Sequence, residues 1–358
     1  MNALLPAPEA AALPAPAWLF HGLLLLTFSV HVLFMNVTLG AGLIGAVHAV
    51  GKAATDDRRA QLHAALARIL PTSVSFTITT GVAPLLFVQV LYGQLFYPAT
   101  ILIGWAWLAI PGLLIVGYAA VYAMTGGRGR AIRWLGLSAA CFLAIAVVQV
   151  TANVLQLTPA RWAGVAAGAT SALAEATLLP RLLHFLLGAL AVGGLALAVV
   201  ARAAEDDGWP GRLGARWALG ATAAQMAAGF WFLFSLPPEI LRALLAGRAP
   251  ATPLLAVAMG LGFLTLILLA RLERPARQPA LLHGAAASLL LTVLTMVMLR
   301  DAVRDLYLAP VLQAPPAVRT QLDLLLVFVV VLLAGLGTLA WIGRRLVREA
   351  GSRPGAAK

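Results

Sequence analysis

The sequence predicts an all-α polytopic membrane protein, and three observations lead to this class. Of the 358 residues, 61% are hydrophobic and only 11% are charged, whereas soluble domains are nearer half apolar and a quarter charged. The mean hydropathy is +0.93. The apolar residues are also gathered in blocks that reach the roughly 20 residues needed to cross a bilayer. This pattern excludes a soluble enzyme, a disordered chain and a nucleic-acid-binding domain.

The apolar blocks predict about nine transmembrane helices in one domain, residues 17–343. The expected spans are residues 17–50, 72–92, 101–124, 134–157, 181–202, 215–236, 252–271, 280–300 and 322–343. The first block is long enough to tilt or to project from the bilayer. Residues 1–16 form a short N-terminal segment without the marks of a signal peptide, and residues 344–358 form a basic tail.

The distribution of basic residues predicts an orientation. The net charge is +12, and 18 of the 25 Lys and Arg residues lie in the tail and in one alternating set of connections. Cytoplasmic connections carry the excess of Lys and Arg. We therefore expect an external N-terminus and a cytoplasmic C-terminus in the bacterial inner membrane, which agrees with an odd number of spans.

Acidic residues and cysteine narrow the possible functions further. All 13 Asp and Glu residues fall in predicted loops, tails or helix ends, which argues against a proton-coupled transporter or pump, since these carry buried carboxylates. The only cysteine, Cys141, lies inside an apolar block. The chain therefore cannot form an intrachain disulfide or attach a c-type haem.

His184 and Met259 are the strongest candidates for a cofactor site. His184 follows Arg181 by three residues, and Met259 lies about seven residues into the span 252–271. Both spans are expected to enter from the outside, which puts the two residues within about a turn of one depth. Imidazole and thioether together form a ligand pair of low-spin haem iron. The alternative is ordinary packing, especially for the methionine.

Other polar residues in the spans are weaker candidates. His31 lies at mid-membrane or somewhat outside it, whereas His21 is expected at the outer interface and His48 and His63 in solvent at the cytoplasmic end. Asn153 and Gln149 share one helix face and predict either interhelical hydrogen bonds or a partner for a quinone carbonyl or a haem propionate. The hydroxyl groups of Ser73, Ser75, Thr77, Thr79 and Thr80 are expected to bond to their own helix.

At these residues the chain resembles the large, haem-bearing subunit of cytochrome bd quinol oxidases. Three segments carry the resemblance: residues 31–40 (HVLFMNVTLG), 181–195 (RLLHFLLGALAVGGL) and 259–264 (MGLGFL). The resemblance implies that His31 is an axial ligand in the high-spin haem pair. It also implies that His184 and Met259 bind the low-spin b haem.

The departures from this family bear on function. Its two glutamates on the third span correspond here to Pro111 and roughly Ala119, and its haem-ligating glutamate on the eighth span falls near Val297. Arg300 echoes an arginine motif that follows this glutamate. The long quinol-binding loop is reduced to residues 237–251. Without these carboxylates, we expect no oxygen reduction.

The sequence thus predicts a b-type cytochrome subunit that transfers electrons between the quinone pool and an extracytoplasmic redox partner. The cofactor is haem b, with one haem expected and two or more possible. The expected partners are membrane lipid, quinone and further subunits, including a cytochrome c or a multihaem or iron–sulfur protein. An oxygen-reducing quinol oxidase, a cofactor-free transporter or channel, and a structural anchor stay open, and no catalytic residue is assigned.

Overall fold

The computed structural model describes residues 12–50, 56–126, 131–203, 208–247, 250–312 and 317–351, and these are almost entirely helical. Nine of the described helices are long and apolar enough to cross a membrane, as predicted. They are α1 (Ala17–Val50), α2 (Asp56–Leu102), α3 (Gly104–Thr125), α4 (Ala131–Leu157), α6 (Leu178–Ala203), α7 (Trp209–Phe234), α9 (Ala251–Ala270), α10 (Pro279–Leu308) and α11 (Leu322–Gly351). The chain is a multi-pass membrane protein. Most of the predicted N-terminal segment and the end of the basic tail lie outside the described residues.

The helix α2 is far longer than the predicted span 72–92, because its first turns are amphipathic rather than uniformly apolar. Leu62, Leu66 and Ile69 recur at helical spacing and are buried in a core that includes residues of α1, α3 and α4. Charged residues on the opposite face lower the mean hydropathy of this stretch. The helix then continues past a kink at Tyr92, where φ is −130° and ψ is 27°.

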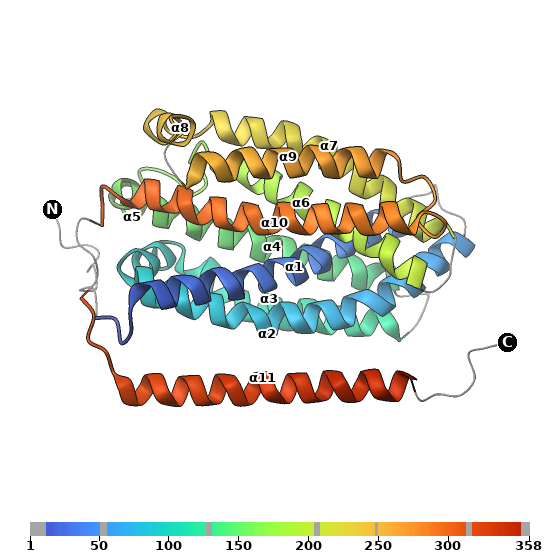
Figure 1. The fold of residues 1–358 in the computed structure, drawn as a ribbon. Coiled ribbons are helices and arrows are strands. Elements are labelled where there is room, and N and C mark those ends of the chain that lie inside the picture. Colours follow the sequence, from blue (N-terminus) through green and yellow to red (C-terminus); the bar gives the residue numbers. More distant parts are fainter. Residues whose placement is uncertain are drawn as a thin grey trace.

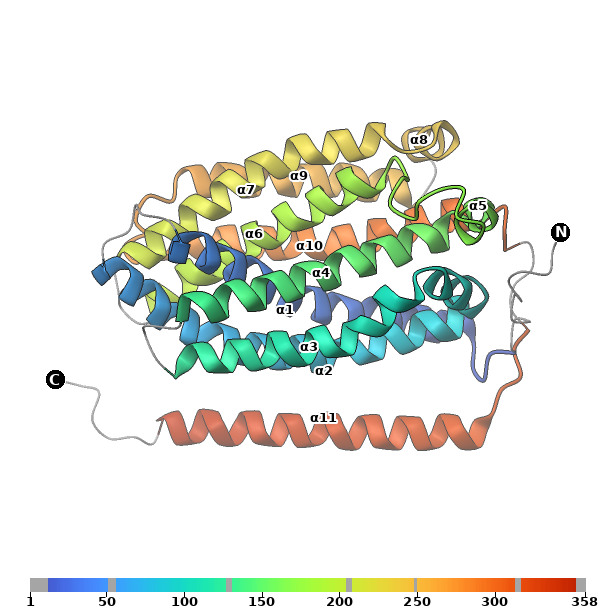
Figure 2. The same ribbon diagram turned by 180° about the vertical axis from the view of Figure 1, so that it is seen from behind.

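Eight of the spanning helices form two groups of four that lie side by side (Figures 1 and 2). In the first group α1 packs on α2 and α4, and α3 also packs on both. In the second group α7 packs on α6 and α9, and α10 closes the ring against both. The short helices η1 (Pro159–Arg161), α5 (Trp162–Ala166) and α8 (Pro238–Leu245) lie at one end. We call this end the α8 end and the opposite one the basic end.

Small residues join the two groups where α1 crosses α6. A Cβ atom at Gly40 would overlap the backbone of Ala189, and one at Gly193 would overlap the backbone of Gly40 and Ala41. Helices in membranes approach closely where residues lack side chains. The α1–α6 contact is therefore a direct backbone contact that allows no larger residue.

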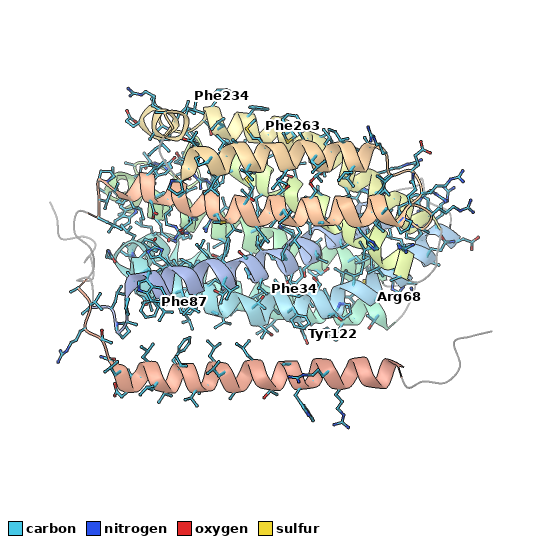
Figure 3. All side chains as sticks on the ribbon, in the orientation of Figure 1. Phe34, Arg68, Phe87, Tyr122, Phe234 and Phe263 are labelled. Carbon is cyan, nitrogen blue, oxygen red and sulfur yellow. The ribbon has the colours of Figure 1, made fainter. Side chains whose placement is uncertain are left out.

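The last helix, α11, stands apart from both groups. Every described side chain of α11 except that of Leu325 is exposed, and Figures 1 and 2 show the helix alongside the bundle without packing on it. Tyr122 of α3 lies on the side of the bundle that faces it (Figure 3). At the α8 end the strand-like segment before α11 pairs with residues 13–14, including Leu13 N–H donating to Ala317 O at 2.7 Å.

The α1–α6 contact predicts different costs for the same substitution at two glycines. Gly193→Leu should destabilise the protein by about 3 kcal/mol or more, because the clashing atoms are backbone that cannot repack. Gly335→Leu on α11 is the matched control: no atom lies within 4 Å of a Cβ there, and the change should stay within about 0.5 kcal/mol. Thermal unfolding of the detergent-solubilised protein measures both, and equal effects would contradict the prediction.

Candidate functional site

The stretch of α6 around His184 is only partly buried. No residue between Pro180 and Ala189 is fully buried, although the stretch covers more than two helical turns. The neighbouring part of α10 does contain buried residues, Val297, Leu299 and Ala302. Towards the basic end, a core that includes Leu195, Ala218 and Leu282 closes the group. We call the level of α6 residues 181–188 the His184 layer.

The imidazole of His184 lies against α7. A Cβ atom at Gly229 would stand 3.1 Å from Cε1 of the ring, and the ring centroid is 6.3 Å from that of Phe232. The Nδ1 atom is buried, and none of the described residues forms a hydrogen bond of ordinary length with it, although the carbonyl of Gln225 lies nearby. A buried polar atom without a partner costs about 1–3 kcal/mol, and ligation of a metal ion is one way to satisfy it.

Contacts through α7 place Met259 at the level of His184. The thioether of Met226 on α7 lies against Gly262 of α9, with Sδ 3.3 Å from the position of a Cβ atom. Gly229, which contacts His184, lies three residues from Met226 towards the α8 end. Met259 lies three residues from Gly262 in the same direction. The half-buried Met259 is therefore within about a turn of His184 in depth. The two residues lie on different helices, α9 and α6, and each of these helices packs on α7.

Met226 is a residue that the sequence argument missed. Its thioether is half-buried and lies between α7 and α9 near the same layer. The adjacent Gln225, which packs against Gly188 of α6, is a polar residue within an apolar span. The polar Gln225 indicates that this part of α7 faces the interior of the bundle, and this signal in the sequence could have identified Met226. Two methionines, and not only Met259, can thus supply a thioether to the layer.

His31 is held by a hydrogen bond that leaves one ring nitrogen available. Its Nδ1–H donates to the carbonyl of Thr77 at 3.0 Å, and the ring packs on Gly81 of α2. Metal-ligating histidines commonly donate one N–H to such a carbonyl. The contact of Gly40 with Ala189 puts His31 at about the level of Arg181, one turn nearer the α8 end than His184.

The serine and threonine residues 73–80 of α2 include one that forms hydrogen bonds to α1. Four of these residues, Ser75, Thr77, Thr79 and Thr80, bond to the carbonyl four residues back, as predicted. The prediction was wrong for Ser73, whose hydroxyl donates to the carbonyl of Phe34 and contacts Thr38 Oγ1 at 2.6 Å. This residue faces α1 and so finds an interhelical partner.

Arginines gather at the α8 end of α10. The guanidinium of Arg300 lies over the ring of Phe28, 4.7 Å from its centroid, and that of Arg304 lies 4.9 Å from the centroid of Tyr92. Arg304 also pairs with Asp301 at 2.8 Å, and both side chains are nearly buried. No ion pair holds Arg300 in the part of the chain that the structure describes.

Arg181 adds a third guanidinium from α6. It lies 4.8 Å from the ring centroid of Phe232 and donates to Asn153 Oδ1 over a long 3.4 Å, while its buried Nε has no hydrogen-bond partner among the described residues. Asn153 therefore makes the predicted interhelical bond. Gln149 is exposed and so does not share the interhelical bond of Asn153, because the 40° offset between i and i+4 turns it out of the packed interior. The alternative role of the two amides, as partners of a quinone carbonyl or a haem propionate, stays a prediction.

Three of the remaining histidines pack against other side chains or the backbone. His21 makes an edge contact with Tyr92, with centroids 6.0 Å apart. The expectation that His48 and His63 are solvated is wrong. His48 is half-buried beside the rings of Trp209 and Trp217, and His63 Nε2–H donates to the carbonyl of Met124 at 2.9 Å. Both lie where amphipathic helix ends pack together.

Comparison with known proteins adds no family assignment. No protein-family model matches the chain, and no curated protein sequence matches it. The site must therefore be interpreted from its own residues.

Asp301 and Glu239 form ion pairs at the α8 end, and we expect their substitution to lower the stability of the protein by different amounts. Asp301→Asn leaves Arg304 buried without a counter-charge and should destabilise the protein by about 3 kcal/mol or more. Glu239→Gln removes a pair with Arg242 whose side chains are 75% and 76% exposed, and should cost less than about 1 kcal/mol. Unfolding midpoints in detergent test this, and equal shifts would show that Arg304 is not dependent on Asp301.

Proposed function

We propose that the chain is a b-type cytochrome subunit of the bacterial inner membrane, and that it transfers electrons between quinone and a redox partner at the α8 end. The observation that carries the proposal is the placement of three potential iron ligands near one depth: His184 lies in the His184 layer, Met259 lies at the same level and His31 lies about one turn away.

The arrangement of donors favours a macrocycle over a metal ion held by protein alone. The described residues contain no group of three or more His, Cys, Asp and Glu that could hold a metal ion. A haem supplies four equatorial nitrogens itself and needs only one or two axial ligands from the protein. Single imidazoles on separate helices, such as His184 and His31, meet that need.

The arginines supply the charge that haem requires. Three guanidinium groups, those of Arg181, Arg300 and Arg304, lie at the α8 end. Asp301 pairs with Arg304, and Glu175 interacts electrostatically with Arg181, whereas Arg300 has no ion pair among the described residues. Haem carries two propionates. Because Arg181 and Arg300 lie one to two turns nearer the α8 end than His184, they would hold these carboxylates by charge-assisted hydrogen bonds.

Each residue then has a defined role in electron transfer. Bound haem b would exchange single electrons, and a Met ligand raises its potential. The carbonyl of Thr77 fixes the ring orientation of His31. By the positive-inside bias the α8 end faces outward, so the arginines direct the haem edge towards an external partner. That partner carries any c-type haem, because Cys141 is the only cysteine.

The proposal predicts a spectroscopic loss specific to one histidine. His184→Ala should abolish the low-spin b-type band in the reduced-minus-oxidised spectrum of the purified protein, because the axial nitrogen is gone. His283→Ala, which removes an exposed imidazole near the basic end of α10, should leave the band intact. A wild-type protein purified without b haem would reject the proposal and favour a transporter or channel.

A redox titration followed by the same spectra identifies the sulfur ligand of the haem. Met259→Leu should lower the midpoint potential of the low-spin haem, because the thioether is the ligand that raises it. Met226→Leu is the matched substitution on α7 and should leave the potential unchanged. The reverse result would assign the thioether ligand to Met226 while leaving the haem proposal in place.

The arginine assignment has its own test. Arg300→Gln should weaken haem retention by about 10- to 100-fold, since a hydrogen bond to a charged group contributes about 1.5–3 kcal/mol. Pyridine-haemochrome quantification after prolonged washing measures the retained haem. Arg242→Gln, on the exposed helix α8, is the control. Equal haem content in all three proteins would show that Arg300 does not hold the propionates.

A further inference from the structure

A groove on the surface of the bundle is formed by α6 and α7. Its volume is about 350 Å³, and its walls are Leu187 and Leu190 of α6 and the stretch 213–224 of α7. The lining positions on α7 recur every three to four residues, so the groove runs along the helix for about 16 Å. Gly220 and Ala224 stand at its wall in mid-span and leave space beside the two leucines.

The groove has different chemistry at its two ends. Towards mid-span it is wholly apolar, whereas towards the basic end it is lined by Arg216 and Trp217. Arg216 is the only charged residue in the lining, and its side chain is exposed. It lies seven residues into α7, or about 10 Å from the start of the helix, so its guanidinium can extend towards the membrane surface.

The side chain of Trp217 is fixed by contacts with residues of other helices. Its ring makes an edge contact with His48 of α1, with centroids 5.9 Å apart and planes at 77°. Trp217 also packs against a core that includes residues of α1, α2 and α4. Helices behind α7 therefore fix the tryptophan beside Arg216.

We propose that this groove binds one anionic phospholipid, with the phosphate on Arg216 and an acyl chain along α7 between Leu190 and Ala224. An arginine donates two parallel hydrogen bonds to a phosphate, and basic pockets between transmembrane helices on the cytoplasmic side bind acidic lipid head groups. The basic end is the cytoplasmic one by charge bias. The apolar length of the groove accommodates a chain rather than a compact solute. The site is separate from the haem site and does not depend on it.

Native mass spectrometry of the full chain tests the proposal, with palmitoyl-oleoyl phosphatidylglycerol and the zwitterionic phosphatidylcholine of the same chains as probes. We expect one phosphatidylglycerol to be retained at least about tenfold better than phosphatidylcholine. Arg216→Gln should remove this preference. Arg271→Gln, an exposed arginine at the same end of the bundle, should preserve it.

A second variant tests the part of the groove that we propose for the acyl chain. Ala224→Phe fills the exposed mid-span wall and should reduce retention of both lipids at least about fivefold. Equal retention of the two lipids by the wild type overturns the proposal, and so does a preference that survives Arg216→Gln. Displacement of phosphatidylglycerol by ubiquinone at equal concentration would assign the groove to a quinone instead and overturn it as well. Because lipid is detected by mass, a protein without haem gives the same readout.

Discussion

The backbone contact between α1 and α6 is the constraint on which the rest of the structure depends. Gly40 and Gly193 bring the two helices together without side chains between them, and this contact joins one group of four helices to the other. It also sets a fixed register: His31, nine residues before Gly40, lies about one turn from His184 along the bundle. A larger residue at either glycine would separate the groups and change the depth of one histidine relative to the other.

A tight contact at one level is accompanied by looser packing at another. Towards the basic end, small and branched residues of α6, α7, α9 and α10 form a closed core, whereas the stretch of α6 around His184 contains no fully buried residue. At the α8 side of this stretch, Arg300 has no ion pair among the described residues. The haem proposal rests on the imidazole of His184 in this stretch and on the nearby guanidinium groups.

The two ends of the bundle have different charge chemistry. At the α8 end Arg300 and Arg304 lie over aromatic rings, and Arg304 pairs with Asp301. At the basic end Arg216 lies at the surface beside an apolar groove. Burial thus separates the arginines that we propose for cofactor binding from the arginine that we propose for lipid binding. The isolated helix α11, tied to the bundle near Leu13, takes no part in either site.

The sequence alone was sufficient for the number of spans, their order and most of their bounds, because hydropathy is a property of single residues summed along the chain. It also made His184, Met259 and His31 candidates, since polar and sulfur-containing side chains stand out in apolar spans, and their role as ligands stays a prediction. The length of α2, the interhelical bond of Ser73, the outward turn of Gln149 and the thioether of Met226 were decided only by the tertiary structure. Each depends on which face of a helix meets a neighbour, and that is set by contacts such as Gly40 on Ala189 between residues far apart in the chain.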